Sequence, residues 1–327
     1  MVKRRVHRSR YAPLDVQQPD GLQASPGPIT SLRHIGRSWP PLVLSTSCAS
    51  FSIGDALLER TEIGLRVVDQ DARDASTTGR VPALEVRAGD RFWLGDVEFL
   101  ALDAGLESLR PALAACIGLN DDHHIDRALA LASRGGTLAL VGPFGTGAAW
   151  LARQIHNTGP HRGSPFVVLD HTSPPLDHDH RGTAFVDLNK LPTAAAARLF
   201  AAINRTRVIV GSVAPRWLEL LARRRDPVAV IELVPLARRS HDVVPLLDAH
   251  WANALGSSHR TDELGDGVHY LAEHPWPGNL DELHHQSRRL LALLEHRTLK
   301  AAARALGIRR QTLMGHLDRL GVRLGRE

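Results

Sequence analysis

The 327-residue chain contains few of the residue types that stabilise secreted proteins, and it has no long apolar run. Its two cysteines, Cys48 and Cys116, are too few for a disulfide framework or a thiolate metal site. No stretch of roughly eighteen apolar residues occurs, so we expect no transmembrane helix and no membrane partner. The basic N-terminus precedes no apolar segment, which argues against a secretory signal. These absences favour a soluble, cytoplasmic protein.

Aspartate and histidine are concentrated in one loop, at residues 170–180. Two histidines at i, i+2 in a proline-containing loop have no helix or strand to fix their side chains. We interpret this loop as a solvated segment and expect no metal ion.

Positive charge is concentrated at the two ends of the chain. Residues 1–10 carry five Lys or Arg and no acid, and residues 297–327 carry eight against two acids. Because the whole chain has a net charge of +5, the remaining middle is acidic. This asymmetry suggests local contacts with a polyanion, although a solvated tail and helix face would have the same composition.

The chain has segments that differ in composition and periodicity, which predicts a multidomain fold. Short apolar runs between turn residues are typical of a β-sandwich, whereas helical segments alternating with apolar runs predict an α/β domain with a parallel sheet. We expect a basic, disordered tail at 1–29, a β-sandwich at 30–103, a linker at 104–120, an α/β domain at 121–235, a helical segment at 236–295 and a second, compact helical unit at 296–327.

The stretch LALVGPFGTGAAW, at 138–150, is typical of a buried strand, a glycine-rich turn and the start of a helix. This is the order found in phosphate-binding P-loops, G-x-x-x-x-G-K-[ST], whose backbone amides surround a phosphate. Gly142 and Gly147 have the required spacing, but Ala148 and Ala149 occupy the lysine and hydroxyl positions. The few lysines of the chain lie elsewhere in the sequence.

The stretch LKAAARALGIRRQTLMGHLDRLGV predicts two helices joined by a turn at Gly307. An ordinary helical hairpin would share this pattern, but the short turn, the small alanines and the basic charge favour a DNA-binding helix-turn-helix. Side chains at the start of the second helix would contact bases or phosphates, and others would contact the DNA backbone. The expected DNA-binding residues are Arg304, Arg309, Arg310, Gln311, Thr312, His316 and Arg319.

The same segment resembles the Fis-type helix-turn-helix at the end of bacterial enhancer-binding proteins, the sigma-54-dependent activators. Upstream, WPGNLDEL resembles that family's lid motif WPGN-[VI]-REL, and VIELVPLARRSHDVVPLL resembles its VxLPPLRERxxDIPxL segment. GPFGTGAAWLARQIH resembles its GESGTGKELVARAIH at the phosphate turn. The matches follow the family's order over about residues 121–322. The resemblance implies an AAA+ fold with a helical lid at 236–295, a domain that hydrolyses ATP and remodels RNA polymerase in the family.

The resemblance carries over only part of the family's nucleotide site. Asp187 stands at the magnesium ligand, but Leu188 replaces the catalytic glutamate, Ala148 the lysine and Asp281 the sensor arginine. Loss of well-placed charges slows phosphoryl transfer by orders of magnitude, so we expect that the chain is not an ATP-hydrolysing enzyme. Binding of ATP with magnesium stays open. The residues retained for it are Gly142, Gly145, Thr146, Gly147, Asp187 and Arg225.

The loop that contacts sigma-54 in the family is missing from this sequence. Only sixteen residues run from Val167 to Gly182, where the family has a long insertion, and no GAFTGA-like string occurs. We therefore expect no contact with sigma-54.

The β-rich segment resembles a forkhead-associated (FHA) domain, a β-sandwich that binds phosphothreonine. Ile35-Gly36-Arg37 matches its opening I-G-R, and residues 88–95 match its closing motif. Arg37 and Ser50 retain phosphopeptide-binding positions, whereas Asp74 falls near the family's asparagine and would repel phosphate. An interaction or structural module, with a protein partner, is favoured over phosphothreonine binding.

These patterns predict a transcriptional regulator that acts by occupying double-stranded DNA. A half-site of a few base pairs gives too little specificity in a genome, so we expect a homodimer or higher oligomer. Two alternatives stay open. One is an AAA+ ATPase activator with displaced catalytic groups, and the other is a protein-interaction adaptor whose helix-turn-helix is vestigial.

Overall fold

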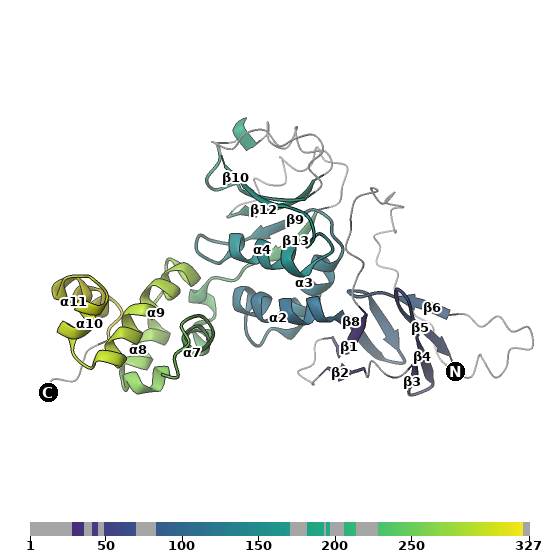
Figure 1. Ribbon diagram of the computed structural model, residues 1–327, viewed down its shortest axis with the longest axis horizontal. Coiled ribbons are helices and arrows are strands. Elements are labelled where there is room, and N and C mark those ends of the chain that lie inside the picture. The colour runs from purple at the N-terminus through teal and green to yellow at the C-terminus, as the bar shows by residue number, and fades with distance from the viewer. Residues whose placement is uncertain are drawn as a thin grey trace, which may run out of the picture. The chain divides into compact units, whose positions relative to one another are not determined.

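The computed structural model describes residues 28–35, 41–44, 49–69, 83–170, 182–192, 194–196, 206–213 and 228–322, with the elements labelled in Figure 1. The chain divides into two compact units. The first unit comprises residues 1–114, 120–140 and 149–231, and the second comprises 115–119, 141–148 and 232–327. The segment boundaries expected from the sequence stay predictions.

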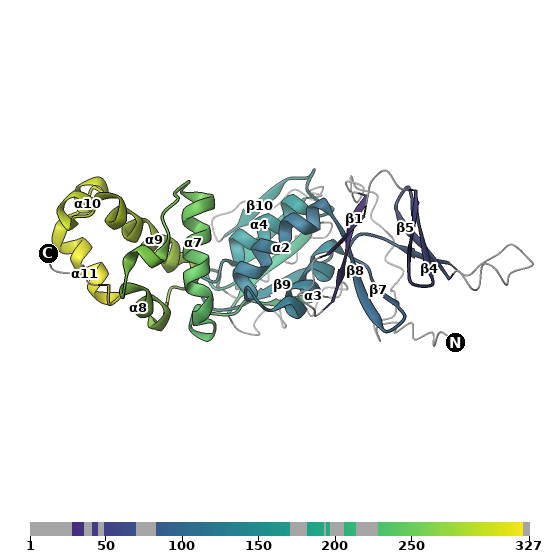
Figure 2. The same cartoon turned by 90° about the horizontal axis from the view of Figure 1, so that it is seen from below.

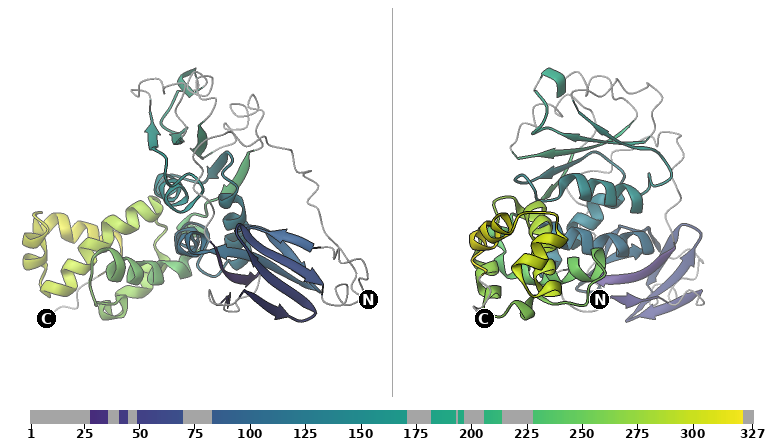
Figure 3. Two further views of the ribbon diagram at one scale, coloured as in Figure 1. Left: turned by 45° about the vertical axis from the view of Figure 1, so that its right-hand side comes forward. Right: turned by 60° about the vertical axis from the view of Figure 1, so that its left-hand side comes forward.

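In the first unit, two antiparallel four-stranded sheets pack against each other (purple to blue in Figure 3). Their strand orders are β2-β1-β8-β7 and β3-β4-β5-β6. The strands are β1 (Ile29–His34), β2 (Leu42–Val43), β3 (Ser50–Ile53), β4 (Ala56–Thr61), β5 (Gly64–Asp69), β6 (Ala83–Val86), β7 (Arg91–Leu94) and β8 (Val97–Asp103). Leu32, Leu58 and Phe99 belong to one apolar core that both sheets share. The segment is therefore a β-sandwich.

A buried ion-pair network joins the sandwich to the two helices that follow it. These helices are α2 (Ala104–Ile117) and α3 (Asp122–Ser133). Arg33 of β1 lies 2.9 Å from Asp122 (Nη2 to Oδ1) and 3.1 Å from Asp126 (Nε to Oδ1). Arg110 of α2 forms ion pairs with the same two carboxylates. The side chain of Asp126 is 0% exposed, so its charge depends on these partners.

A five-stranded sheet has the order β10-β11-β12-β9-β13. Its strands are β9 (Leu138–Val141), β10 (Phe166–Leu169), β11 (Thr183–Asp187), β12 (Arg207–Ser212) and β13 (Ala229–Glu232), and α4 (Ala148–Thr158) follows β9. Strands β10, β11 and β12 run parallel in unbroken register, and β11 and β12 are buried almost throughout. The parallel α/β fold expected from four apolar runs is confirmed, and β13 adds a short fifth strand.

The helix expected at LPTAAAARLFAAI falls mostly outside the described residues. Residues 194–196 are helical, and residues 197–205 are not described.

The second unit is mainly helical. Its helices and 3₁₀ turns are η1 (Leu236–Arg238), η2 (Ser240–Asp242), α7 (Val243–Ala254), η3 (Thr261–Leu264), α8 (Gly267–Glu273), α9 (Asn279–His296), α10 (Leu299–Ala305) and α11 (Arg310–Arg319). Helix α9 packs against α7, α10 and α11 (Figure 2). The buried Trp251 donates from Nε1 to the carbonyl of Ser287, which ties α7 to α9. Among the described helices, none is long and apolar enough to cross a membrane.

Replacing Arg33 with methionine tests the buried network. Arg33→Met leaves the Asp126 carboxylate buried without its nearest cation, so we expect the free energy of unfolding to fall by about 3–5 kcal/mol. The matched control is Arg66→Met, because Arg66 pairs with Glu85 at 2.9 Å on the surface. Urea unfolding followed by circular dichroism should show a lower midpoint for the first variant and little change for the second. Equal midpoints would contradict a role for the network.

Candidate functional site

The phosphate turn joins β9 to α4. Gly145 and Gly147 have φ values of +76° and +90°, a region that favours glycine. A Cβ atom at Gly145 would lie 2.0 Å from the carbonyl oxygen of Gly278, and one at Gly142 would lie 2.6 Å from that of Leu233. Close backbone contacts therefore require glycine at these positions.

A turn at the start of α9 holds the phosphate turn in place. Asn279 is only 3% exposed, and its Nδ2 donates to the carbonyl of Phe144 at 2.7 Å. Its Oδ1 accepts from the backbone N–H of Leu236 at 3.0 Å. The backbone N–H of Asp281 donates to the carbonyl of Gly145 at 3.1 Å. One side-chain amide thus connects the phosphate turn, η1 and α9.

Three positions of the nucleotide motifs, Thr146, Ala148 and Asp281, lie at or next to this turn. The Thr146 hydroxyl is buried and donates to the carbonyl of Pro143 at 2.8 Å, so it stabilises the turn itself. Ala148 begins α4, and the side chain of Asp281 is exposed in the first turn of α9.

Asp187 ends β11 in the first unit, and its carboxylate already has partners. Its Oδ1 accepts from the backbone N–H of Asn189 at 3.1 Å, and its Oδ2 lies 3.3 Å from Nζ of Lys190. The Lys190 side chain is 72% exposed, and such a surface ion pair is weak. The neighbouring Leu188 is buried in the apolar core.

Helices α10 and α11 form a pair joined by a turn at Gly307, whose φ is +66°. Ala302 and Ala303 of α10 are buried, as are Leu313 and Leu317 of α11, at the spacing read from the sequence. This packing leaves the opposite side of α11 free to contact a partner.

The residues expected to contact DNA lie on the surface of this helix pair. The exposed ones are Arg304, Arg309, Arg310, Gln311, Thr312 and Arg319. His316 is half-buried. Because Arg309 directly precedes α11, the structure brings the run from Arg309 to Thr312 together at the N-terminal end of that helix.

His316 and Arg319 contact each other one turn further along α11. Arg319 donates from Nη2 to Nδ1 of His316 at 2.8 Å, so a neutral His316 carries its proton on Nε2. Burial, with the charges of Arg289 and Arg319, lowers the pKa of His316. Burial and Arg319 likewise lower the pKa of Arg289, which belongs to α9. Arg289 therefore lies in the same basic region.

Several sequence expectations fall on residues that the structure does not describe. These are Arg37, Asp74, Arg225, the N-terminal segment at 1–27 and the loop at 171–181. Ser50 is exposed on β3, directly opposite Glu59 of β4. A carboxylate at that position disfavours a phosphate beside Ser50. Within the described ranges, no group of three or more His, Cys, Asp or Glu side chains is arranged for a metal ion.

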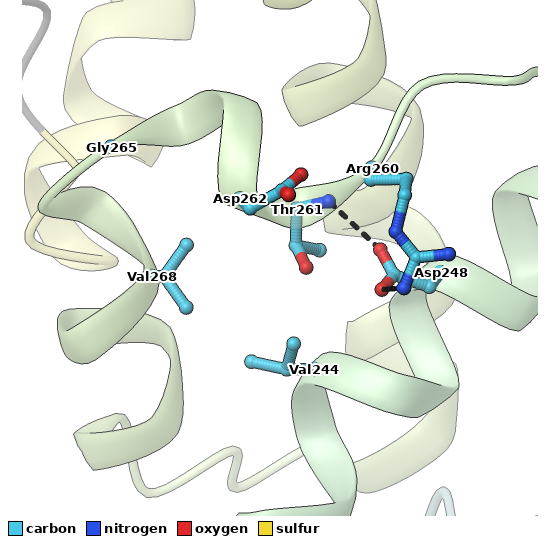
Figure 4. Close-up of a pocket in the computed structure, with 7 residues that line it drawn as sticks. All are labelled: Val244, Asp248, Arg260, Thr261, Asp262, Gly265 and Val268. Atoms are coloured by element: carbon cyan, nitrogen blue, oxygen red, sulfur yellow. Dashed lines mark hydrogen bonds and ion pairs between the residues drawn. The ribbon is translucent and has the colours of Figure 1, made fainter.

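A cavity of about 340 Å³ lies among α7, η3 and α8 (Figure 4). Its lining residues are Val244, Asp248, Arg260, Thr261, Asp262, Gly265 and Val268. The Asp248 carboxylate accepts from the backbone N–H of Thr261 at 2.8 Å and from Arg260 at 3.0 Å, as the dashed lines show. Both of its oxygens are engaged in fixing η3 to α7.

Comparison with known proteins shows relatives among transcriptional regulators. No protein-family model matches the chain. A DNA-binding transcriptional regulator NtrC from Azospirillum brasilense is 26% identical over 208 residues, which cover 48% of this chain and 43% of the relative. The NtrC of Rhizobium meliloti (strain 1021) is 26% identical over 210 residues, with the same shares covered. The chain spans less than half the length of these relatives.

The solved structures that are similar include NtrX from Brucella abortus in complex with ATP. Its sequence is 16% identical and its TM-score is 0.39. The match covers 67% of this chain and 69% of that chain. Its ADP complex has 17% identity and a TM-score of 0.38, over 71% and 70%. The P-loop NTPase domain of a sigma-54 transport activator from E. coli has 20% identity and a TM-score of 0.23, over 34% and 91%.

The parallel sheet and the glycine turn after β9 define an α/β protein with a P-loop-like turn. Over about half of its length, the chain is similar in sequence to transcriptional regulators named NtrC. The resemblance carried by the phosphate turn, the WPGNLDEL stretch and the C-terminal segment is confirmed at the level of the family.

The comparisons contradict the expectation that the chain is not an enzyme. Its relatives and similar structures are NtrC, NtrX and a P-loop NTPase domain, and NtrX was solved with ATP and with ADP. The expectation rested on three side chains, those of Ala148, Leu188 and Asp281. It gave too little weight to the backbone, because a P-loop surrounds phosphate with main-chain amides and this chain retains the turn that supplies them.

Three residues that shape these sites were not selected from the sequence. Asn279 lies in a Pro-Gly-Asn turn before a helix, where a side-chain amide commonly satisfies backbone groups. Arg289 lies on a helix that the sequence did not connect with the DNA-binding pair. Gly315 is an isolated glycine within a helical pattern, a signal that often marks a packing or functional requirement.

Replacing Asn279 with glycine isolates the contribution of its amide. Asn279 has a φ of +49°, so glycine relieves the backbone and removes only the hydrogen bonds of the side-chain amide, those with Phe144, Leu236 and Pro277. We expect the free energy of unfolding to fall by about 2 kcal/mol. The matched control is Arg297→Gly at the other end of α9, where φ is +53°. Thermal unfolding should show no loss for the control; the same result for Asn279→Gly would contradict the role of the amide.

Proposed function

We propose that this chain is a transcriptional regulator that binds double-stranded DNA through α10 and α11. The observation that carries the proposal is the N-terminal end of α11, where four polar side chains are exposed while Leu313 anchors the helix in the core. An α-helix fits the major groove of DNA, and helix-turn-helix proteins contact bases from the start of their second helix. The NtrC relatives are named DNA-binding transcriptional regulators.

The chemistry of these side chains matches the edges of base pairs. Arg309 and Arg310 can each donate two hydrogen bonds to a guanine, and Gln311 can pair with an adenine. Arg304 and Arg319, which lie further from the start of α11, would contact phosphates and set the orientation of the helix on the duplex.

One helix pair covers only a few base pairs, so the active form is a homodimer or higher oligomer on two half-sites. The connection between β10 and β11, residues 170–182, is too short for a GAFTGA loop, which supports regulation without contact to sigma-54. The β-sandwich, resembling an FHA domain, serves as a module for a protein partner. Within the first unit, the ion pairs between Arg33 and α3 fix this module to the helix that precedes β9.

Nucleotide binding at the phosphate turn is the second function that we propose. It is supported by the positive φ values of Gly145 and Gly147 and by the start of an eleven-residue helix directly after them. Backbone amides in such a turn bind the phosphates of a nucleotide without a lysine, although a lysine adds affinity.

The double variant Arg309→Ala/Arg310→Ala tests DNA binding. Loss of two base or phosphate contacts should weaken affinity for duplex DNA by more than about tenfold, since each good contact is worth roughly 1–3 kcal/mol. Fluorescence anisotropy with duplexes selected from a random pool measures the affinity. The control is Arg127→Ala, an exposed arginine on α3.

Genome-wide occupancy separates a regulator from an adaptor. Wild-type protein should occupy discrete sites, and the double variant should lose them. If the wild type occupies no DNA, or if occupancy survives in the double variant, the chain binds its partners through another surface and the DNA-binding proposal fails.

Adding the lysine at the phosphate turn tests nucleotide binding. Ala148→Lys should tighten ATP binding by about tenfold or more, because a charge-assisted hydrogen bond contributes roughly 1.5–3 kcal/mol. Ala149→Lys is the control, since it adds the same charge at the next, exposed position. Isothermal titration with ATP and magnesium measures binding, and phosphate release measures turnover. No binding by the wild type or by Ala148→Lys would contradict the second function.

A further inference from the structure

Helices α9 and α11 carry a basic cluster that pairs with no carboxylate among the described residues. It consists of Arg289, His316 and Arg319, and none of these side chains forms an ion pair with a carboxylate in the part of the chain that the structure describes. Arg289 donates to the side chain of Gln286 at 3.0 Å, and Arg319 donates to the carbonyl of Gly315 at 3.0 Å. Both guanidinium groups are thus held by neutral oxygen acceptors, and like charges near each other interact unfavourably.

Helix α11, which carries His316 and Arg319, packs against α9, which carries Arg289. The positive charge of Arg319 contributes to the lowered pKa of Arg289, and both arginines contribute to the lowered pKa of His316. The contact from Arg319 to Nδ1 of His316, at 2.8 Å, leaves the Nε2–H of a neutral His316 available as a donor. The cluster therefore offers several N–H donors to an anion.

The glycine beside this cluster is the second observation. Gly315 stands in the middle of α11, where glycine is the least favourable residue after proline. Its φ is not positive, and a Cβ atom at this position would meet no other atom within 4 Å. Among the residues that the structure describes, neither a clash nor a positive φ therefore requires glycine here. A partner that approaches the helix backbone closely would give one.

The cluster lies on the same side of α11 as part of the proposed base-reading end. Thr312, His316 and Arg319 are spaced i, i+4 and i+7, which places them on one side of a helix. Arg289 extends this side onto α9. A duplex that receives the start of α11 in its major groove would have its backbone beside the groove, where such a cluster can reach it.

We propose that Arg289, His316 and Arg319, beside the bare backbone at Gly315, form a binding site for one phosphate of the DNA backbone. The inference rests on the proposed DNA-binding function and adds α9 to the interface. The two guanidinium groups and the Nε2–H of His316 bind the phosphate oxygens, and the missing side chain at Gly315 lets the sugar–phosphate chain come close to α11. Such a contact positions the protein and does not read sequence.

The first test compares two neighbouring arginines. Arg289→Gln should weaken DNA binding about fivefold or more for every duplex sequence, and should reduce the slope of log K against log salt by about 1. Arg288→Gln is the matched control, because Arg288 acts on His250 of α7 and not on this cluster. Anisotropy titrations at several salt concentrations measure both quantities.

The second test uses one substitution that should raise the stability of the protein and weaken its binding to DNA. Gly315→Ala should raise the melting temperature by about 2 °C, because alanine favours a helix and meets no clash here. The same variant should weaken DNA binding, because its methyl group blocks the close approach. A role in folding alone cannot produce both changes.

The outcomes separate this inference from the proposed function. One outcome is that the wild type binds DNA and that Arg309→Ala/Arg310→Ala weakens this binding, whereas Arg289→Gln and Gly315→Ala bind as the wild type does. In that case the proposed phosphate site is wrong and the DNA-binding function stands. If the wild type does not bind DNA, both are wrong. Weaker binding with a reduced salt slope for Arg289→Gln, together with a more stable but weaker-binding Gly315→Ala, supports the site.

Discussion

One buried amide, that of Asn279, holds together the parts of the second unit that carry both candidate sites. Its two polar atoms satisfy a carbonyl of the phosphate turn and a backbone N–H of η1, while its own backbone begins α9. A buried backbone group without a partner is costly, so the shape of the turn depends on this side chain. Helix α9 then runs for 18 residues and packs against α10 and α11. The helix that fixes the phosphate turn also supports the proposed DNA-binding pair.

The short connection between α9 and α10 restricts how these two helices can be oriented relative to each other. Only Arg297 and Thr298 separate the two helices: Arg297 takes a left-handed φ of +53° that ends α9, and the Thr298 hydroxyl accepts from the N–H of Ala301 to begin α10. Two residues with these local roles leave little rotational freedom between the helices. Helix α11 then packs against α9 through a side that buries Leu313 and Leu317.

Charge has two different roles in the two units. In the first unit, Arg33 is matched by carboxylates of α3, and the buried pairs serve the structure because each charge has its counter-charge. In the second unit, Arg289 and Arg319 lie near each other without an acid, an arrangement that contributes nothing favourable to folding. This contrast is the reason that we assign the first network to stability and propose that the second binds a polyanion outside the chain.

The amino-acid sequence by itself determined the elements that depend on periodicity: the strands of the parallel sheet, the buried alanines and leucines of α10 and α11, and the glycine turn after β9. These follow from local patterns, because burial and backbone conformation restrict residue type at fixed spacing. The sequence motifs also indicated the resemblance to transcriptional regulators that the NtrC relatives support, but reasoning from single missing side chains led to a wrong conclusion about enzymatic activity. Only the tertiary structure decided which distant residues meet, such as Asn279 with Phe144 and Arg33 with Asp126, and which helix packs beside α11. Such contacts join positions far apart in the chain, and no local spacing encodes them.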